Sequence, residues 1–513
     1  MTDAGSEGGM GAARIRRPLR VTLPVLATVA IVLPLAWMWQ ASRMPGAYSV
    51  MDMGYLDYGS TGLNPGAGGH SGHGEGNGHD HYSGPVRSIT DLVADPARPA
   101  DVRVDLVTRQ EVLTIGGRSI AGFTVNGTSP GPEIRAKQGQ LIEVHLRNES
   151  VAAGVALHWH GLDVPNAMDG VAGVTQDALP VGGEFTYRFV ADRAGSFWYH
   201  SHQVSNSQVA GGLLGALVVT PQPGVAQQVD LSALAHTYGG VRTINGKAED
   251  LRVGARPGQR VRVRVTNTDN GPMQIWTGGS YRLLAIDGAE INQPSQVSGR
   301  SVTLTAGARA DIEVQAPAHG AAARLQLSKA TAVIIGPPSA EASLPPQPRE
   351  ELDLLTYGSP APLGFDPARA TRHFDYLIGR RPGFVKGRPG MWWSINGHLY
   401  PNVPMFVVRE GDVALVHIEN RSSEVHPMHL HGHHMVVLAR DGVAATGSPW
   451  WVDSLNVAAS ESYDVAFVAD NPGIWMDHCH NLKHAADGMV AHLMYEGFDT
   501  PYRLAGPAEN RPE

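Results

Sequence analysis

The chain has 513 residues, of which 42% are hydrophobic and 17% charged, and its formal net charge is −8. The apolar fraction excludes an intrinsically disordered chain, and the acidic balance argues against nucleic acid as a partner. The length suits about three domains at the usual 100–200 residues each. With 61 glycines and 36 prolines, and few long helical periods, the sequence favours a turn-rich, all-β fold.

The first predicted element is an apolar helix at Val21–Ser42, after a short N-terminal region at residues 1–20. The segment carries no charged side chain and reaches the roughly 20 residues that a membrane-spanning helix needs. Four arginines precede it, so residues 1–20 should stay cytoplasmic and the main body should lie on the extracytoplasmic side. We therefore predict a transmembrane anchor. A cleaved signal peptide is the alternative, and Arg16-Arg17 matches a twin-arginine export signal poorly.

Residues 43–97 follow as a predicted flexible tether, rich in glycine, histidine and methionine between residues 44 and 85. No run of apolar residues there is long enough to bury a core. Histidine-rich tracts and closely spaced methionines bind copper in other contexts. The candidate ligands are Met51, Met53, His70, His73, His79 and His81. A plain linker with incidental histidines is the alternative.

The body of the chain is a threefold internal repeat. Each copy has an Asn-Gly turn, then a glycine, then an alternating strand that ends in an asparagine nine residues after that glycine. The turns are Asn126-Gly127, Asn245-Gly246 and Asn396-Gly397, and the closing residues are Asn148, Asn267 and Asn420. Half-buried strands of this kind predict an antiparallel β-sandwich in each repeat.

The repeats define the predicted domain boundaries. The three domains are expected at residues 98–221, 229–340 and 350–500, with a C-terminal tail at 501–513. The linkers between them are Pro221–Gln228 and Gly336–Arg349, which are rich in proline.

The single cysteine of the chain, Cys479, lies between His478 and His480. A lone cysteine cannot form an internal disulfide, and a thiolate between imidazoles is a strong ligand for a soft metal. His484 and Met489 follow at five and ten residues. Two histidines, one cysteine and a weak axial methionine form the ligand set of a blue-copper electron-transfer site. A buried cysteine among core histidines is the alternative.

Four His-x-His pairs stand at equivalent places in the first and third repeats. They are His158/His160, His200/His202, His429/His431 and His478/His480. Alternate side chains of a strand share a face, so each pair presents two imidazoles together while Cys479 points away from its neighbours. The pairs predict an eight-histidine metal cluster between domains 1 and 3. The middle repeat has no histidine at this place, and Ser201 takes the place of the cysteine in the first.

These motifs resemble those of the three-domain multicopper oxidases, the laccase-like family, over roughly Val102 to Met494. The resemblance implies three tandem cupredoxin-like Greek-key β-sandwich domains and four copper ions. It implies type 1 copper at His426, Cys479 and His484, with Met489 axial. It implies type 2 copper at His158 and His429, and the two type 3 coppers at His160, His200, His202, His431, His478 and His480.

The resemblance also implies an activity, in which four one-electron oxidations of a donor are coupled to the reduction of O2 to two waters. Electrons would pass through Cys479 to its histidine neighbours. Asp169 matches the carboxylate that the family places near the cluster for proton supply, although an Asp-Gly turn is the alternative. The family often carries a second acid directly after the type 1 histidine, but this chain departs from that pattern with Ala485 there and Asp487 nearby, so the second proton relay stays open. Asp453 is expected in a solvated turn or, as the second choice, on the substrate face.

The electron donor stays open. A phenol or aromatic amine is the first hypothesis, and Cu(I) or Fe(II), in the service of copper tolerance, is the second. The tether and the anchor favour copper handling, but the stretch from Thr356 to Met391 has no methionine before its end and so no methionine-rich insertion. Copper sequestration without turnover is a third hypothesis, disfavoured by a complete cluster wired to Cys479. A two-domain nitrite reductase would need neither three repeats nor eight cluster histidines.

Overall fold

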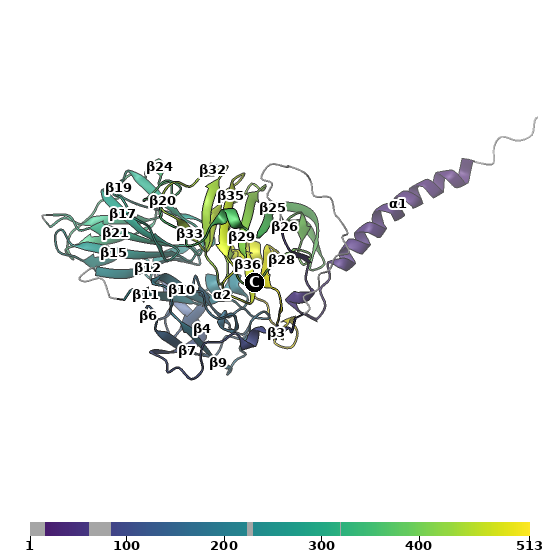
Figure 1. Cartoon of the computed structure of the whole chain (residues 1–513), viewed down its shortest axis with the longest axis horizontal. Coiled ribbons are helices and arrows are strands. Elements are labelled where there is room, and N and C mark those ends of the chain that lie inside the picture. The colour runs from purple at the N-terminus through teal and green to yellow at the C-terminus, as the bar shows by residue number, and fades with distance from the viewer. Residues whose placement is uncertain (1–15, 61–83, 223–228, 319) are drawn as a thin grey trace, which may run out of the picture.

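The computed structural model describes residues 16–60, 84–222, 229–318 and 320–513. The chain is mostly β, and its main sheets come in three successive pairs. In Figure 1 the first pair lies at the bottom, the second at the left and the third at the right, so that all three meet near the centre.

The first pair of sheets is formed by residues 102–220. One sheet contains β5 (Arg118–Val125), β4 (Val102–Ile115), β7 (Leu141–Asn148) and β9 (Glu184–Val190) in spatial order. The other contains β6 (Ile134–Lys137), β11 (Leu214–Thr220), β10 (Gly195–Ser201) and β8 (Leu157–His160). Val144 from one sheet and Phe197 from the other belong to the same buried cluster, so the sheets pack face to face. The short helices η3 (Asn166–Met168) and α2 (Ser205–Ala210) lie in the connections.

The second pair is formed by residues 229–351. One sheet contains β13 (Val241–Ile244), β12 (Val229–Tyr238), β15 (Arg260–Asn267), β21 (Arg309–Gln315), β17 (Ser280–Ile286) and β18 (Ala289–Glu290), with β19 (Val297–Ser298) also paired to β17. The other contains β14 (Leu251–Gly254), β23 (Thr331–Gly336), β22 (Ala323–Leu327), β16 (Met273–Thr277), β20 (Arg300–Leu304) and β24 (Glu350–Glu351).

The third pair follows the short helix η4 (Pro367–Arg369). Its larger sheet contains β27 (His398–Leu399), β26 (Arg388–Ile395), β25 (Arg372–Val385), β29 (Val413–Asn420), β35 (Ser462–Val468), β31 (Met435–Arg440) and β32 (Val443–Ala444), with β33 (Trp450–Val452) also on β31. The other contains β2 (Tyr55–Asp57), β28 (Pro404–Val408), β37 (Val490–Tyr495), β36 (Ile474–Cys479), β30 (His426–Leu430) and β34 (Ser454–Val457). Helix α3 (Leu482–Ala486) lies between β36 and β37.

The three Asn-Gly turns have one structure. Asn126, Asn245 and Asn396 have φ angles of 54°, 51° and 51°, in the left-handed region that asparagine tolerates better than most residues. The Asn126 side chain accepts a hydrogen bond from Val107 N at 2.7 Å and donates one to Asp105 O at 2.8 Å. The other two make the same pair of bonds to the strands before them. The same local sequence therefore fixes the same hairpin three times.

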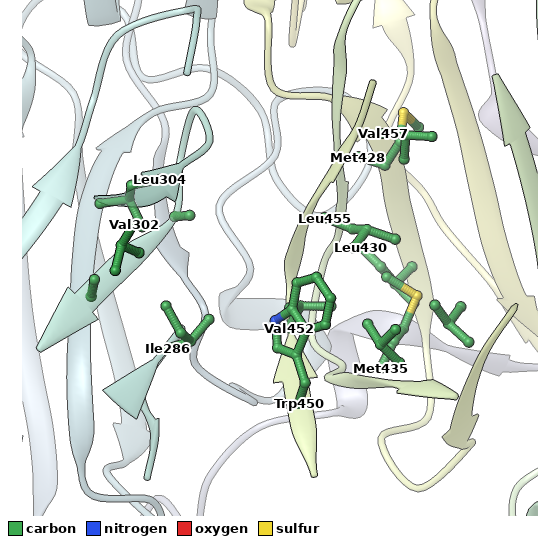
Figure 2. Packing of buried hydrophobic residues seen from close by; sticks show 14 of the residues in the cluster. Ile286, Val302, Leu304, Met428, Leu430, Met435, Trp450, Val452, Leu455 and Val457 are labelled. Carbon is green, nitrogen blue, oxygen red and sulfur yellow. The ribbon is translucent and has the colours of Figure 1, made fainter. Parts of the chain in front are cut away.

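The second and third pairs of sheets share one apolar core. Ile286, Val302 and Leu304 of the second pair belong to the same buried cluster as Trp450 and Val452 of the third. Figure 2 shows these two groups of side chains facing each other across the boundary. Burial of this apolar area holds the middle domain against the third.

Helix α1 (Arg16–Ala41) covers the predicted transmembrane segment, and Figure 1 shows it extending away from the sheets. Its side chains are described only from residue 26 onward, and these are largely exposed. Within the described part of the chain, no helix is both long and apolar enough to cross a membrane. The transmembrane anchor and the membrane partner predicted from the sequence are therefore not supported.

Both ends of the segment predicted as a flexible tether are instead paired in strands or packed in a core. Strand β1 (Ala47–Tyr48) pairs with β39 (Leu504–Ala505), β2 joins the third domain, and β3 (Arg87–Ser88) pairs with β38 (Phe498–Asp499). Val50 of η1 (Val50–Asp52), Met53 and Ile89 of η2 (Ile89–Asp91) are buried in a core cluster. The prediction was wrong here because single apolar residues fill gaps at an existing core. The four tract histidines lie outside the described residues.

Candidate metal centres

The first candidate centre joins the start of β30 to the end of β36 and to helix α3. His426 opens β30, Cys479 closes β36 and His484 lies in α3. Cys479 Sγ is 3.7 Å from Nδ1 of each histidine, and the two Nδ1 atoms are 3.3 Å apart. Cys479 and His426 are fully buried and His484 is 7% exposed. We call these three side chains the cysteine group.

The outer nitrogens of this group are tied to the protein, which turns the inner ones toward the sulfur. Nε2 of His426 lies 2.9 Å from Ser422 Oγ, and Nε2 of His484 lies 3.2 Å from a Glu424 carboxylate oxygen. Burial and then the neighbouring His484 lower the pKa of His426 to about 3. Burial raises the pKa of the Cys479 thiol, and a bound cation would reverse that shift. Two neutral imidazoles and one thiol of this kind suit copper.

Met489 lies beside the cysteine group. Its carbonyl accepts a hydrogen bond from Cys479 N at 3.2 Å, and its own N–H donates to His484 O at 3.0 Å. The side chain is fully buried in the same apolar cluster as Cys479. The ring of Trp393 packs against both histidines, with centroids 4.6 Å from His426 and 4.5 Å from His484.

The second candidate centre contains all eight paired histidines, and we call it the histidine cluster. Their nitrogens fall into three groups within 4.8 Å. The groups are His158/His160/His429, His160/His200/His480 and His202/His431/His478. Strands β8 and β10 of the first domain supply or lead into half of the rings, and β30 and β36 of the third domain supply or lead into the rest. Nε2 of His158 lies 3.4 Å from Nε2 of His429, so the two domains meet here.

The neighbours of Cys479 lie in different groups of the histidine cluster. His478 joins His202 and His431, while His480 joins His160 and His200. Cys479 itself belongs to the cysteine group. The two candidate centres are therefore connected through adjacent residues of one strand end.

The cluster has the properties of a metal site. Each of its rings is at most 1% exposed. Among the described residues, Nδ1 of His160, Nε2 of His200 and both nitrogens of His202 and His480 have no hydrogen-bonding partner. Burial lowers the pKa of these four histidines, to about 3 for His160, so the rings are neutral. Orphaned, neutral imidazole nitrogens that converge in a dry site fit copper ions, which accept their lone pairs.

Asp169 holds two rings of the cluster. One carboxylate oxygen is 3.0 Å from Nδ1 of His158 and the other is 3.1 Å from Nδ1 of His431. The residue ends η3 and is 1% exposed. A hydrogen bond at Nδ1 leaves Nε2 free to face the centre of the cluster.

Asp453 occupies neither of the places expected from the sequence. It is fully buried, and its carboxylate lies 3.1 Å from Nε2 of His160. Arg309 of the middle domain, also fully buried, binds it through two nitrogens at 2.6 and 2.5 Å. Burial alone would raise the pKa of Asp453, but Arg309 and the hydrogen bond from His160 hold it well below its usual range. The solvated-turn prediction failed because this arginine comes from another domain.

The middle domain, which carries no cluster histidine, also covers the cluster directly. Gly307 has φ of +81°, and a Cβ built there would lie 2.8 Å from His160 Cε1 and 3.0 Å from the His480 ring. Its carbonyl accepts a hydrogen bond from Trp198 Nε1 at 3.1 Å. Only glycine combines this conformation with this closeness. The contact was not visible in the sequence, where Gly307 is one of 61 glycines.

The acid that the resembled family often carries after the type 1 histidine is absent from that place. Ala485 is buried, and Asp487 forms an exposed pair with Lys483 at 2.9 Å. His433 and His434 closely follow the His429/His431 pair and contact residues at the cluster. His433 Nδ1 lies 3.0 Å from His431 O, and His434 Nε2 lies 3.4 Å from an Asp453 carboxylate oxygen.

Comparisons with known proteins point in one direction. Residues 106–224 and residues 367–497 each match a multicopper oxidase family description. The chain is 27% identical over 455 residues to Laccase-1 of Botryotinia fuckeliana, covering 75% of this chain and 80% of that protein. It is 25% identical over 466 residues to the iron transport multicopper oxidase fetC of Epichloe festucae, covering 75% of each.

A solved structure shows the same arrangement. The multi-copper oxidase of Pseudomonas thermotolerans matches with a TM-score of 0.63 and 27% identity, over 77% of this chain and 100% of that one. The matched 77% of this chain is longer than any two pairs of sheets together, so the likeness includes residues of all three pairs.

Proposed function

Because this chain belongs to the laccase-like multicopper oxidase family, an O2-dependent oxidoreductase family with four coppers, we propose that its cysteine group is the type 1 site and its histidine cluster the trinuclear site. His426, Cys479 and His484, with Met489 axial, would hold type 1 copper. His158 and His429 would hold type 2 copper. The type 3 coppers would be held by His160, His200, His202, His431, His478 and His480. The observation that supports the assignment is that the eight histidines form overlapping groups of converging nitrogens, apart from the group of His426, Cys479 and His484.

Copper in these groups would supply one-electron transfer at Cys479 and reduction of O2 to two waters at the cluster. The chain itself provides the connection, because His478 and His480 are bonded through the backbone to Cys479 and lie in different type 3 groups. A path of a few covalent bonds needs no side-chain movement. The buried rings of the cluster also keep bulk water and the donor away from the oxygen chemistry.

Asp169 is the candidate catalytic carboxylate. Its two oxygens contact Nδ1 of His158 and Nδ1 of His431, one from each domain. It therefore orients two ligands and places a proton acceptor against the cluster, where O2 reduction consumes protons. Asn in its place would keep the contacts but lose the ionisable group.

We propose a small organic donor, such as a phenol or an aromatic amine, that reaches the cysteine group at His484. This ring is the most exposed of the three. Glu424, whose side chain is 46% exposed, lies 3.2 Å from its outer nitrogen. An exposed carboxylate at the electron-accepting ring can take the proton that a phenol releases on oxidation.

A metal ion, Cu(I) or Fe(II), is the second candidate donor. The Glu424 carboxylate favours it as well, because an exposed acid next to His484 attracts a cation to the same ring. The 25% identity to an iron transport oxidase adds to this support.

The test is steady-state oxidation of a dimethoxyphenol, Cu(I) and Fe(II) by the copper-loaded enzyme, with O2 uptake recorded at the same time. We expect four electrons per O2 with any accepted donor and the highest kcat/KM with the phenol. A higher kcat/KM with either metal ion would favour the second candidate. Copper binding without O2 uptake for all three donors would contradict the oxidase assignment.

A further inference from the structure

The last five residues of the chain cross the first domain beside β10. Val204 N donates a hydrogen bond to Arg511 O at 2.6 Å, and Arg511 N donates one to Gln203 Oε1 at 2.8 Å. Gln203 is fully buried and also donates to Glu509 O at 3.0 Å. The segment is thus tied to the residues that directly follow His202 of the cluster.

Asn510 gives the segment a second anchor. It is 2% exposed, and its side chain accepts a hydrogen bond from Ala178 N at 2.8 Å and donates to Asp177 at 2.7 Å and to Arg503 O at 2.8 Å. The anchors at Glu509, Asn510 and Arg511 hold the segment directly before Pro512 and Glu513.

Glu513 reaches a histidine of the cluster. One carboxylate oxygen accepts a hydrogen bond from Ser205 Oγ at 3.0 Å, and the other lies 3.1 Å from Nδ1 of His478. The Glu513 side chain is 7% exposed and that of His478 is fully buried. The approach is not aligned as a full hydrogen bond, and neither of the two atoms has another partner among the described residues. Each atom is therefore the natural partner of the other, because a buried polar group without a partner destabilises the folded state.

This contact fixes which nitrogen of His478 faces the cluster. A carboxylate at Nδ1 keeps the proton on that nitrogen and leaves the lone pair on Nε2. Nε2 of His478 lies 3.3 Å from Nε2 of His431, inside the group that also contains His202. The geometry points to Glu513 as a positioning residue that orients His478 for metal binding. This inference rests on the proposed trinuclear site.

Helix α3 leaves room for this carboxylate. Ala485 of the helix and Glu513 line the same cavity, of about 230 Å³, together with the basic side chains of Lys386 and Arg511. The helix presents only a methyl group at residue 485, the place where the resembled family often has an acid. Glu513 brings a carboxylate to the cavity from a distant part of the chain.

The test compares Glu513→Ala and Glu513→Gln with the wild-type chain, and uses Glu509→Ala as the matched control. The Glu509 side chain is in the same segment but is 74% exposed. Copper affinity is measured by competition with a chelator of graded concentration, and the copper content per chain is read at each step. Blue absorption reports the cysteine group independently.

We expect Glu513→Ala to weaken one cluster copper by about 10- to 100-fold, the usual effect of losing a partner of a metal-binding histidine. Glu513→Gln should retain most of the affinity, because its amide oxygen keeps an acceptor beside Nδ1 of His478. Glu509→Ala should match the wild type, and blue absorption should persist in all four proteins.

Unchanged cluster affinity in Glu513→Ala would overturn the inference, and so would an equal loss in both Glu513 variants. Either result would leave the proposed function standing. A copper-loaded wild type without blue absorption would instead contradict the proposed function.

Discussion

The cysteine group takes its ligands from residues 426–489 of a single domain, whereas the histidine cluster takes its ligands from two domains that are separated in sequence by a third. The cysteine group also approaches the surface through His484, which is 7% exposed and touches the half-exposed Glu424. In the cluster no ring is more than 1% exposed.

The difference follows from what each centre has to contact. In the proposed function a donor comes close to the cysteine group, so its side chains can belong to one local unit with an edge open to solvent. The cluster must be closed on every side, and the two ligand-bearing domains alone do not close it. Gly307 and Arg309 of the middle domain and the segment at 509–513 complete its surroundings.

The strongest test of the separation is Cys479→Ser. A hydroxyl is a poor ligand for the cysteine group, so we expect blue absorption to vanish and donor oxidation to fall to background. The cluster should still bind its copper, because none of its nitrogens has changed. Visible absorption, copper content and O2 uptake measure the three outcomes. Loss of all copper would show that the two centres do not assemble independently.

Arg309→Met tests the dependence of the cluster on the middle domain. The change leaves the Asp453 carboxylate buried without its cation, which costs about 3–5 kcal/mol. We expect the free energy of unfolding of the metal-free chain to fall by that amount in a denaturant titration. Adding Asp453→Asn to the same chain should recover much of the loss. No recovery would mean that Arg309 acts through Asp287, whose pKa burial and then Asp453 raise to about 7.

Gly307→Ala tests the closeness of the middle domain to the rings. The added methyl group would press on His160 and His480 and force a left-handed backbone on alanine, at a cost of about 1–3 kcal/mol. We expect altered electron paramagnetic resonance of the cluster with unchanged blue absorption. Gly258→Ala is the matched control, since its φ is +76° and its nearest neighbour would be 3.8 Å away. Equal effects in both variants would assign the change to backbone strain alone.

Glu424→Gln should have the smallest effect, confined to the donor. Removing the charge beside His484 should raise KM for a cationic donor by a few fold and leave cluster copper unchanged, as expected of an exposed charge. Steady-state kinetics with Fe(II) and a neutral phenol separate the two donors. Glu341→Gln, an exposed acid of the middle domain, is the control. An equal change in KM for both donors would mean that the substitution acts by moving the His484 ring and not by removing the Glu424 charge.

Much of the fold could be predicted, because its signals are local. The Asn-Gly turns and the alternating strands identify three similar β units, and the mostly β architecture is confirmed. The tether prediction failed at Val50, Met53 and Ile89, which belong to no long apolar run in the sequence but fill gaps in a core built elsewhere. Composition alone cannot reveal a partner surface that lies hundreds of residues away.

The candidate ligands could be found from sequence for a similar reason: a strand places alternate residues on one face, and the repeats supply the second copy. The supporting residues could not. Arg309 binds Asp453 across a domain boundary, and Glu513 reaches His478 from the last segment of the chain. No spacing of residues in the sequence predicts either contact, because each contact depends on how the folded parts of the chain pack together.

His158 and His429 lie 271 residues apart and meet at the centre of the molecule. An ion shared between them would cross-link the chain over 271 residues, and in the chain-entropy picture closing a loop of that length stabilises the folded state by about 5–6 kcal/mol. A chain still being synthesised has the first histidine and lacks the second. Loading of such an ion would therefore depend on a complete chain, because a chain that ends before His429 could neither form this cross-link nor gain its resistance to unfolding.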